Sequence, residues 1–100
     1  MKEIIIKDIL SKIEYNEYIG KKEQIITSFI AIDVNNKNSD IICWVNDKNI
    51  DVIPKLKTGT IVVSKASKEK LNNINCNFIL VDNPRSTFRE ILNHFFVEKM

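Results

Sequence analysis

The fold of this chain is decided by its C-terminal quarter, CNFILVDNPRSTFREILNHFFVEKM, which covers Cys76–Met100. Residues 77–82 at its start contain an unbroken apolar run, which is typical of a strand that is covered on both faces. Asn83 and Pro84 follow, and they suit the cap and the first position of a helix. The stretch therefore predicts a buried strand that leads into a helix, the repeating unit of α/β domains.

The residues after Pro84 predict an amphipathic helix. Apolar side chains recur there at helical spacing and form one stripe, while polar side chains fall on the opposite side. The apolar stripe consists of Phe88, Ile91, Leu92, Phe95 and Phe96. The polar side consists of Arg89, Glu90, Asn93 and His94. His94 is the only histidine of the chain. Because no nucleophile or carboxylate is spaced to pair with it, we expect a solvated side chain and not a catalytic base.

The alternation of strand and helix begins earlier, at residue 41. Apolar runs predict strands at 41–45 and 60–64, and a helical pattern follows each of them. In the first of these helices Asn46 and Asp47 can form the cap, and Pro54 predicts an irregular or short helix. The apolar side of this helix consists of Ile50, Ile53 and Leu56, and the helix ends at Lys57-Thr58-Gly59. A further helix is predicted from Ser67 to Leu71, and Asn72-Asn73 ends it. We expect mostly parallel strands joined by right-handed crossovers.

The first forty residues predict smaller elements. Apolar spacings of three and four predict a helix over about residues 5–13. Residues 14–19 predict an edge strand, which a turn at 20–22 ends. Residues 25–34 alternate, and we expect an antiparallel pair here. The side chains expected to share one face of that stretch are Ile26, Ile30, Ile32 and Val34, with Thr27 and Asp33 on the other face.

Together these segments predict one α/β domain over residues 1–100, in which helices flank a small mixed sheet of about five strands. Of the 100 residues, 44 % are hydrophobic, which is enough for a core without metals or disulfides. Polar residues 35–40 predict a loop that is too short for a domain linker.

The charge pattern excludes several classes of function. The net charge is +2 and the lysines are scattered, so we expect no nucleic-acid partner. The three isoleucines at 4–6 are followed by Lys7, Asp8 and Lys12, a pattern that is too short and too charged for a signal peptide or a membrane span. We therefore expect a cytoplasmic protein.

The residue types that carry chemistry are sparse. Cys43 and Cys76 lie in apolar surroundings, which favours buried free thiols of a reduced compartment over a disulfide. Neither cysteine has a histidine or cysteine at metal-ligand spacing. Gly20 and Gly59 stand alone, so there is no glycine-rich phosphate loop. We expect no metal and no cofactor, and no catalytic constellation is apparent.

Two strand ends are the candidate binding positions. Residues 40–49 join a strand end to a helix start, where ligands of α/β proteins collect. Trp44 could offer a stacking plane there, or it could be a core residue. Asn46 could bind a ligand, or serve only as the helix cap. At the second strand end, Arg85 could meet a phosphate or the Asp82 carboxylate, or lie free on the surface.

The segment from Ser39 to Phe96 resembles the N-terminal domain of the UDP-3-O-acylglucosamine N-acyltransferases of lipid A synthesis. Three motifs carry the resemblance, and their order and spacing agree over more than half of the chain. The family's GDISFL-NPKY is similar to SDIICWVNDKN at Ser39–Asn49, its AGAVLV to TGTIVV at Thr58–Val63, and its LVVDNPR to ILVDNPR at Ile79–Arg85, with Phe88 and Phe95-Phe96 after it. The last motif is the most specific.

The resemblance implies a uridine-binding site. In that family two aromatic residues flank the uracil of the nucleotide-sugar substrate, and an asparagine between them reads its polar edge. The asparagine corresponds to Asn46, and the aromatic positions correspond to Cys43 and Asn49, so neither ring is present here. Trp44 is adjacent, and strand alternation places it on the face opposite Cys43. Either Trp44 substitutes for the lost rings, or the ligand is another nucleotide sugar, or none is bound. The implied site residues are Asn46, Trp44, Cys43, Asn49 and Arg85.

The resemblance also implies a substrate-recognition domain of a nucleotide-sugar acyltransferase that is not catalytic on its own. In the family the chemistry belongs to a left-handed β-helix of hexapeptide repeats, which carries the histidine base, uses an acyl carrier protein and forms a homotrimer. These 100 residues contain no such repeats, and His94 does not match that base. The N-terminal domain of the Mur ligases, which has a similar uridine role, is a weaker match. The alternative is a non-catalytic interaction or oligomer-positioning domain that has lost nucleotide binding.

Overall fold

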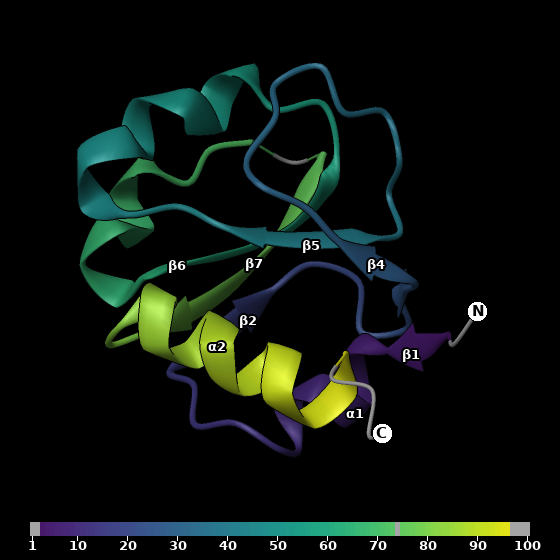
Figure 1. Ribbon diagram of the computed structural model, residues 1–100. Helices are drawn as coiled ribbons and strands as arrows, with labels where there is room; N and C mark the ends of the chain where they lie inside the picture. Colours follow the sequence, from purple (N-terminus) through teal and green to yellow (C-terminus); the bar gives the residue numbers. More distant parts are fainter. Residues whose placement is uncertain (1–2, 74, 97–100) are drawn as a thin grey trace.

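Figure 1 shows the computed structural model of the chain, which describes residues 3–73 and 75–96. A mixed sheet of five strands, in the order β2-β7-β6-β5-β4, forms the centre of the molecule. Its strands are β2 (Glu17–Ile19), β4 (Ser28–Phe29), β5 (Ile41–Trp44), β6 (Gly59–Ser64) and β7 (Cys76–Val81). A second, two-stranded sheet pairs β1 (Ile4–Ile5) with β3 (Ile25–Ile26). The predicted α/β class with a small mixed sheet is confirmed.

The parallel part of the sheet follows the order of the chain. β4, β5, β6 and β7 pair as parallel neighbours in sequence order, and β2 closes the other edge as an antiparallel partner of β7. The predicted edge strand at 14–19 and the three predicted strands from residue 41 onward are therefore present. Every residue of β6 and β7 is buried, as expected for parallel strands covered on both faces.

Helices cover both faces of the sheet (Figure 1). The 3₁₀ helix η1 (Asp47–Lys55) packs Ile50 and Ile53 into one core, which it shares with alternate residues of β5, β6 and β7. The helices α1 (Ile6–Leu10) and α2 (Pro84–Phe95) pack into the second core on the opposite face. A further 3₁₀ helix, η2 (Lys65–Lys70), joins β6 to β7. Because alternate residues of a strand face opposite sides, one continuous apolar run supplies both cores.

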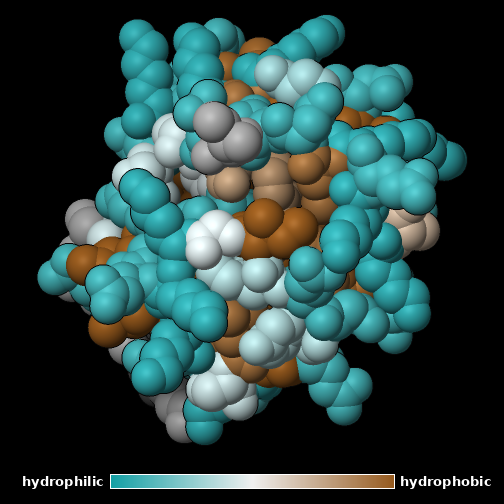
Figure 2. Space-filling model, turned by 180° about the vertical axis from the view of Figure 1, so that it is seen from behind, coloured by the Kyte–Doolittle hydropathy of each residue, from teal (hydrophilic) through white to brown (hydrophobic). Residues whose placement is uncertain are grey.

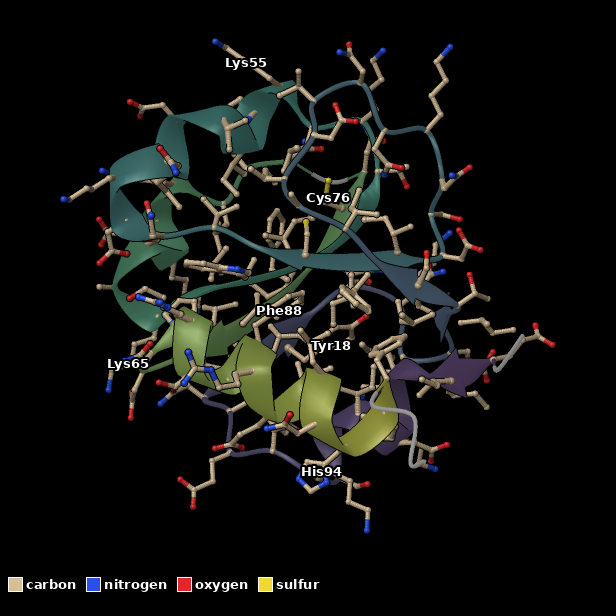
Figure 3. The ribbon with its side chains drawn as sticks, in the orientation of Figure 1. Tyr18, Lys55, Lys65, Cys76, Phe88 and His94 are labelled. Atoms are coloured by element: carbon tan, nitrogen blue, oxygen red, sulfur yellow. The ribbon has the colours of Figure 1, made fainter. Side chains whose placement is uncertain are left out.

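Helix α2 has the structure that its sequence predicts. Asn83 caps it, since its side-chain oxygen accepts a hydrogen bond from the Ser86 N–H, and Pro84 is the first helical residue. Phe88 and Ile91 are buried against the sheet, while the predicted polar side of the helix is exposed. Figure 3 shows Phe88 directed toward the sheet and His94 directed away from it. The prediction of a solvent-facing His94 is confirmed.

Helix η1 is irregular, as Pro54 predicts. It is a 3₁₀ helix, and the backbone leaves helical geometry at Asn49, where ψ is 15°. Asn46 is its cap. Ile50, Ile53 and Leu56 are buried, which confirms the predicted apolar side.

One prediction for the first forty residues is correct in part, and another is wrong. The helix predicted over about 5–13 is present but shorter, as α1, because Ile5 belongs to β1 and pairs with Ile25 across the second sheet. The stretch 25–34 does not present one apolar face. Ile26 lies in the core beneath α1 and α2, whereas the side chains of Ile30, Ile32 and Val34 pack against the other core.

The reason is a change of partner within the stretch. Residues 25–26 pair antiparallel with β1, and residues 28–29 pair parallel with β5. Thr27, between them, donates its N–H to the Asp40 carbonyl oxygen. The expected antiparallel pair therefore exists, but each half of the stretch belongs to a different sheet.

None of the helices within residues 3–73 and 75–96 has both the length and the hydrophobicity that a membrane-spanning helix requires.

Candidate functional site

The carboxyl ends of the three central parallel strands lie on one edge of the sheet, and a helix begins at each of them. η1 follows β5, η2 follows β6 and α2 follows β7. Asn46, Ser64 and Asn83 cap these helices with their own side chains. This edge is where α/β folds generally bind ligands.

A shallow hollow of about 380 Å³ lies on this edge, between the end of β5 and the start of α2. Its lining comes from two segments that are distant in the sequence, residues 44–47 and residues 82–85. The lining residues are Trp44, Asn46, Asp47, Asp82, Asn83, Pro84 and Arg85. Three of the five predicted site residues, Trp44, Asn46 and Arg85, are therefore brought together.

Trp44 supplies the aromatic wall of the hollow. It is half-buried and packs on the same side of the sheet as α2, whereas Cys43 belongs to the opposite core. The predicted alternation of these two residues is confirmed. Part of the indole is packed as core and part lines the hollow, so the core interpretation of Trp44 holds in part and the binding interpretation stays a prediction.

Asn46 has one half of its amide engaged. Its Oδ1 accepts a hydrogen bond of 3.0 Å from the Asn49 N–H, which caps η1. The Nδ2 group makes no hydrogen bond to any residue that the structure describes. An amide carries two donor hydrogens and an oxygen with two lone pairs, so a half-buried Asn46 retains donors and one acceptor site for a ligand.

Charged groups of both signs border the hollow. The Asp82 carboxylate forms an ion pair of 2.9 Å with the Lys65 ammonium, and both side chains are mostly exposed. Figure 3 shows Lys65 beside the start of α2. Asp47 accepts a hydrogen bond from the Ser67 hydroxyl at 3.5 Å. Arg85 is exposed, and within the described chain Asp82 has its ion pair with Lys65 and not with Arg85.

Cys43 and Asn49 stay outside the hollow. Cys43 is only 2 % exposed in the core beneath η1, and burial raises the pKa of its thiol to about 12. Asn49 is exposed on η1, and its N–H is used by the cap. The two positions that correspond to the family's aromatic residues therefore contribute no side chain to this lining.

The two cysteines are free and buried, as predicted. Burial also raises the pKa of the Cys76 thiol, to about 11. β6 lies between β5 and β7, and Cys76 is two residues along β7 from Phe78, which is in register with Cys43, so the two Cα atoms are more than two strand spacings, about 9.5 Å, apart. That separation is more than the roughly 7 Å between Cα atoms that a disulfide spans.

Four lining residues were not among the predicted site residues: Asp47, Asp82, Asn83 and Pro84. Each lies at or shortly after a predicted strand end, which is the signal that could have identified them. The two segments come together only in the folded sheet, because the order β7-β6-β5 leaves a single strand, β6, between the two strands that contribute them.

A larger hollow lies elsewhere, against α1 and β2. This groove of about 900 Å³ has Ile5, Leu10, Tyr15 and Tyr18 among its lining residues, with Lys7, Lys22 and Glu23 also on it. It is distant from the strand edge that carries the predicted site residues. Figure 2 shows apolar surface at the left edge of its view, the side on which β1 lies.

No protein-family model and no curated protein matches this sequence. The family suggested by the three motifs therefore stays a prediction.

Proposed function

We propose that this domain binds the uridine end of a nucleotide sugar and acts as the substrate-recognition domain of an acyltransferase. The observation that carries the proposal is the meeting of Trp44, Asn46 and Arg85 at one hollow on the carboxyl edge of the sheet. Asn46 is the residue that corresponds to the uracil-reading asparagine in the family resemblance.

Each of the three side chains has a role that suits its chemistry. The exposed part of the Trp44 indole would stack on the uracil, and stacking of this kind is worth about 1–3 kcal/mol per base. The Asn46 amide would donate from Nδ2 to a uracil carbonyl oxygen and accept the ring N–H on its second lone pair. Arg85, which lines the hollow, would help to hold the loop in place.

The domain would hold the substrate without reacting with it. By the same resemblance, the acyl transfer would take place on a β-helix of hexapeptide repeats with an acyl carrier protein as donor. The contribution of residues 1–100 is then affinity and orientation of the sugar nucleotide, which lowers the entropic cost of the chemical step elsewhere.

The single tryptophan makes the proposal directly testable, because Trp44 reports on its own hollow. We expect uridine, UDP and UDP-N-acetylglucosamine to quench Trp44 fluorescence, and cytidine or a free sugar to do so more weakly. Asn46→Ser keeps an oxygen at the helix cap and loses the amide, so we expect near-normal stability and about tenfold weaker uridine binding.

Asn93→Ser is the matched control, because Asn93 lies on the exposed side of α2 away from the hollow. Its uridine affinity should equal that of the wild type. Absence of quenching at millimolar uridine and UDP, or an Asn46→Ser variant that binds normally, rejects the proposal.

The alternative function, an interaction or oligomer-positioning domain, is favoured by a different observation. Ile5 and Ile25 are 44 % and 39 % exposed and stand directly opposite each other in the second sheet. Tyr15, 43 % exposed, lines the groove beside Ile5. Exposed apolar side chains gathered in this way are typical of contact surfaces.

Sedimentation equilibrium separates the two functions. If the alternative holds, the wild type is an oligomer at micromolar concentration, Ile5→Lys or Ile25→Lys converts it to a monomer, and uridine leaves Trp44 fluorescence unchanged. A monomeric wild type whose fluorescence uridine quenches rejects the alternative.

A further inference from the structure

The start of α2, which borders the hollow, offers little to a phosphate. At α2, Pro84 has no N–H, the Ser86 N–H donates to the Asn83 side chain at 3.1 Å, and the Thr87 N–H donates to the Asn83 carbonyl oxygen at 3.0 Å. Anion sites at helix starts need free N–H groups. The cap therefore leaves the Arg85 N–H as the only backbone donor in the first turn of α2.

The charged side chains around the hollow also do not favour a phosphate. Asp47 and Asp82 line it together with Arg85. A further cation at this edge, Lys65, is held by Asp82 in an ion pair of 2.9 Å. A phosphate at this edge would meet two carboxylates and would have to compete with Asp82 for the Lys65 ammonium.

We propose, on the basis of the proposed function, that Asp82 determines which class of ligand the hollow binds. The hollow binds the nucleoside end of its ligand, and the phosphates add nothing to the affinity. The neutral base and ribose suit this lining, since carboxylate oxygens accept hydrogen bonds from ribose hydroxyl groups. The phosphates then point out of the hollow into water.

The test compares uridine, UMP and UDP by Trp44 fluorescence at low ionic strength, where exposed charges act most strongly. We expect the wild type to bind the three ligands with affinities within about threefold, the effect of one unscreened charge about 6 Å away in water. Asp82→Asn removes the carboxylate and frees Lys65. We expect the Asp82→Asn variant to bind UDP at least about threefold more tightly than the wild type does, and to bind uridine with unchanged affinity.

Asp51→Asn is the matched control, because Asp51 is an exposed aspartate of η1 outside the lining. It should leave the ratio of UDP to uridine affinity unchanged. The Asp82 pair is exposed, and pairs of that kind contribute little to stability, so the Asp82 variant should fold normally and its circular dichroism spectrum checks this.

The outcomes distinguish the two proposals. If UDP binds the wild type more than about threefold more tightly than uridine, or if Asp82→Asn leaves the ratio unchanged, the inference is overturned and uridine recognition stands. If none of the three ligands quenches Trp44, both fail.

Discussion

At the scale of single residues, the buried thiols make stability depend on alkaline pH. Burial raises the pKa of Cys43 from 9.0 to about 12 and that of Cys76 to about 11. A group whose pKa is higher in the folded state holds its proton more tightly there, so the unfolded state loses protons first as the pH rises. The stabilising effect is complete below pH 9 and is lost as the pH climbs toward 12.

We therefore expect the midpoint of urea unfolding to fall steadily as the pH is raised above 9. Cys43→Ala lowers the midpoint at neutral pH, because it leaves a cavity, but its decline above pH 9 should be shallower than that of the wild type. Tyr18, whose pKa burial raises to about 12, contributes to the decline in both proteins and cancels in the comparison. Equal slopes in the two proteins would contradict the assignment to Cys43.

Single residues were also the scale at which sequence reasoning about the site was most successful. Asn46 as a cap and Trp44 on the face opposite Cys43 follow from local chemistry and from the period of a strand. The ion pair between Asp82 and Lys65 does not follow from either, because it joins the ends of two strands that only the folded sheet makes neighbours. The sequence alone left Arg85 as the partner candidate for that carboxylate.

At the scale of elements, α2 is held to the sheet by its aromatic stripe. Phe88 is 8 % exposed in the core beneath α2, and its ring meets that of Phe29 edge-on, with 6.5 Å between centroids. We expect Phe88→Ala to lower the free energy of unfolding by about 3–5 kcal/mol, the usual cost of truncating a buried phenylalanine. Chemical denaturation measures this.

Arg89→Ala, on the exposed side of the same helix, is the control and should change stability by less than about 0.5 kcal/mol. A Phe88 variant as stable as the Arg89 variant would mean that α2 is not docked through its stripe.

Elements with strong local signals were predictable, and those defined by their partners were not. The strands near 41–45, 60–64 and 77–82 each contain an uninterrupted apolar run, so their sequence identifies them without knowledge of the fold. The stretch 25–34 has a strand-like alternation, but no local feature states that its first half pairs with β1 and its second half with β5. Pairing partners are a tertiary property, and a change of partner at Thr27 ends the alternation.

At the scale of the whole molecule, the parallel order and the position of the hollow have one cause. Strands β4, β5, β6 and β7 are neighbours in the sheet in the order of the sequence. Helix α2, which follows β7, packs on the face of the sheet opposite to η1. This packing places the start of α2 over the strand ends, where it meets Trp44 from β5. The sequence predicted the alternation of strand and helix, and the face taken by the last helix became clear only from the fold.

The antiparallel edge strand β2 pairs with β7, and a buried asparagine of β7 also holds the turn that follows β2, a joint that yields the last prediction. Asn77 is 8 % exposed on β7, its Oδ1 accepts the Lys21 N–H at 3.0 Å, and its Nδ2 donates to the Thr60 hydroxyl at 3.3 Å. Gly20, next to Lys21, has a φ of 137°, and a Cβ there would overlap the Asn77 side chain. The turn after β2 therefore needs glycine for both its backbone and its space.

We expect Gly20→Ala to lower the free energy of unfolding by about 1–3 kcal/mol or more, because strain at a positive φ is combined with displacement of Asn77. Asn77→Ala should also destabilise the protein, since it leaves the Lys21 and Thr60 groups without their partner. The double variant should lose less than the sum of the two single variants, because both changes break the same joint. Additive losses in chemical denaturation would show that the strain lies in the Gly20 backbone alone and that β2 is held to the sheet by its ladder hydrogen bonds without this asparagine.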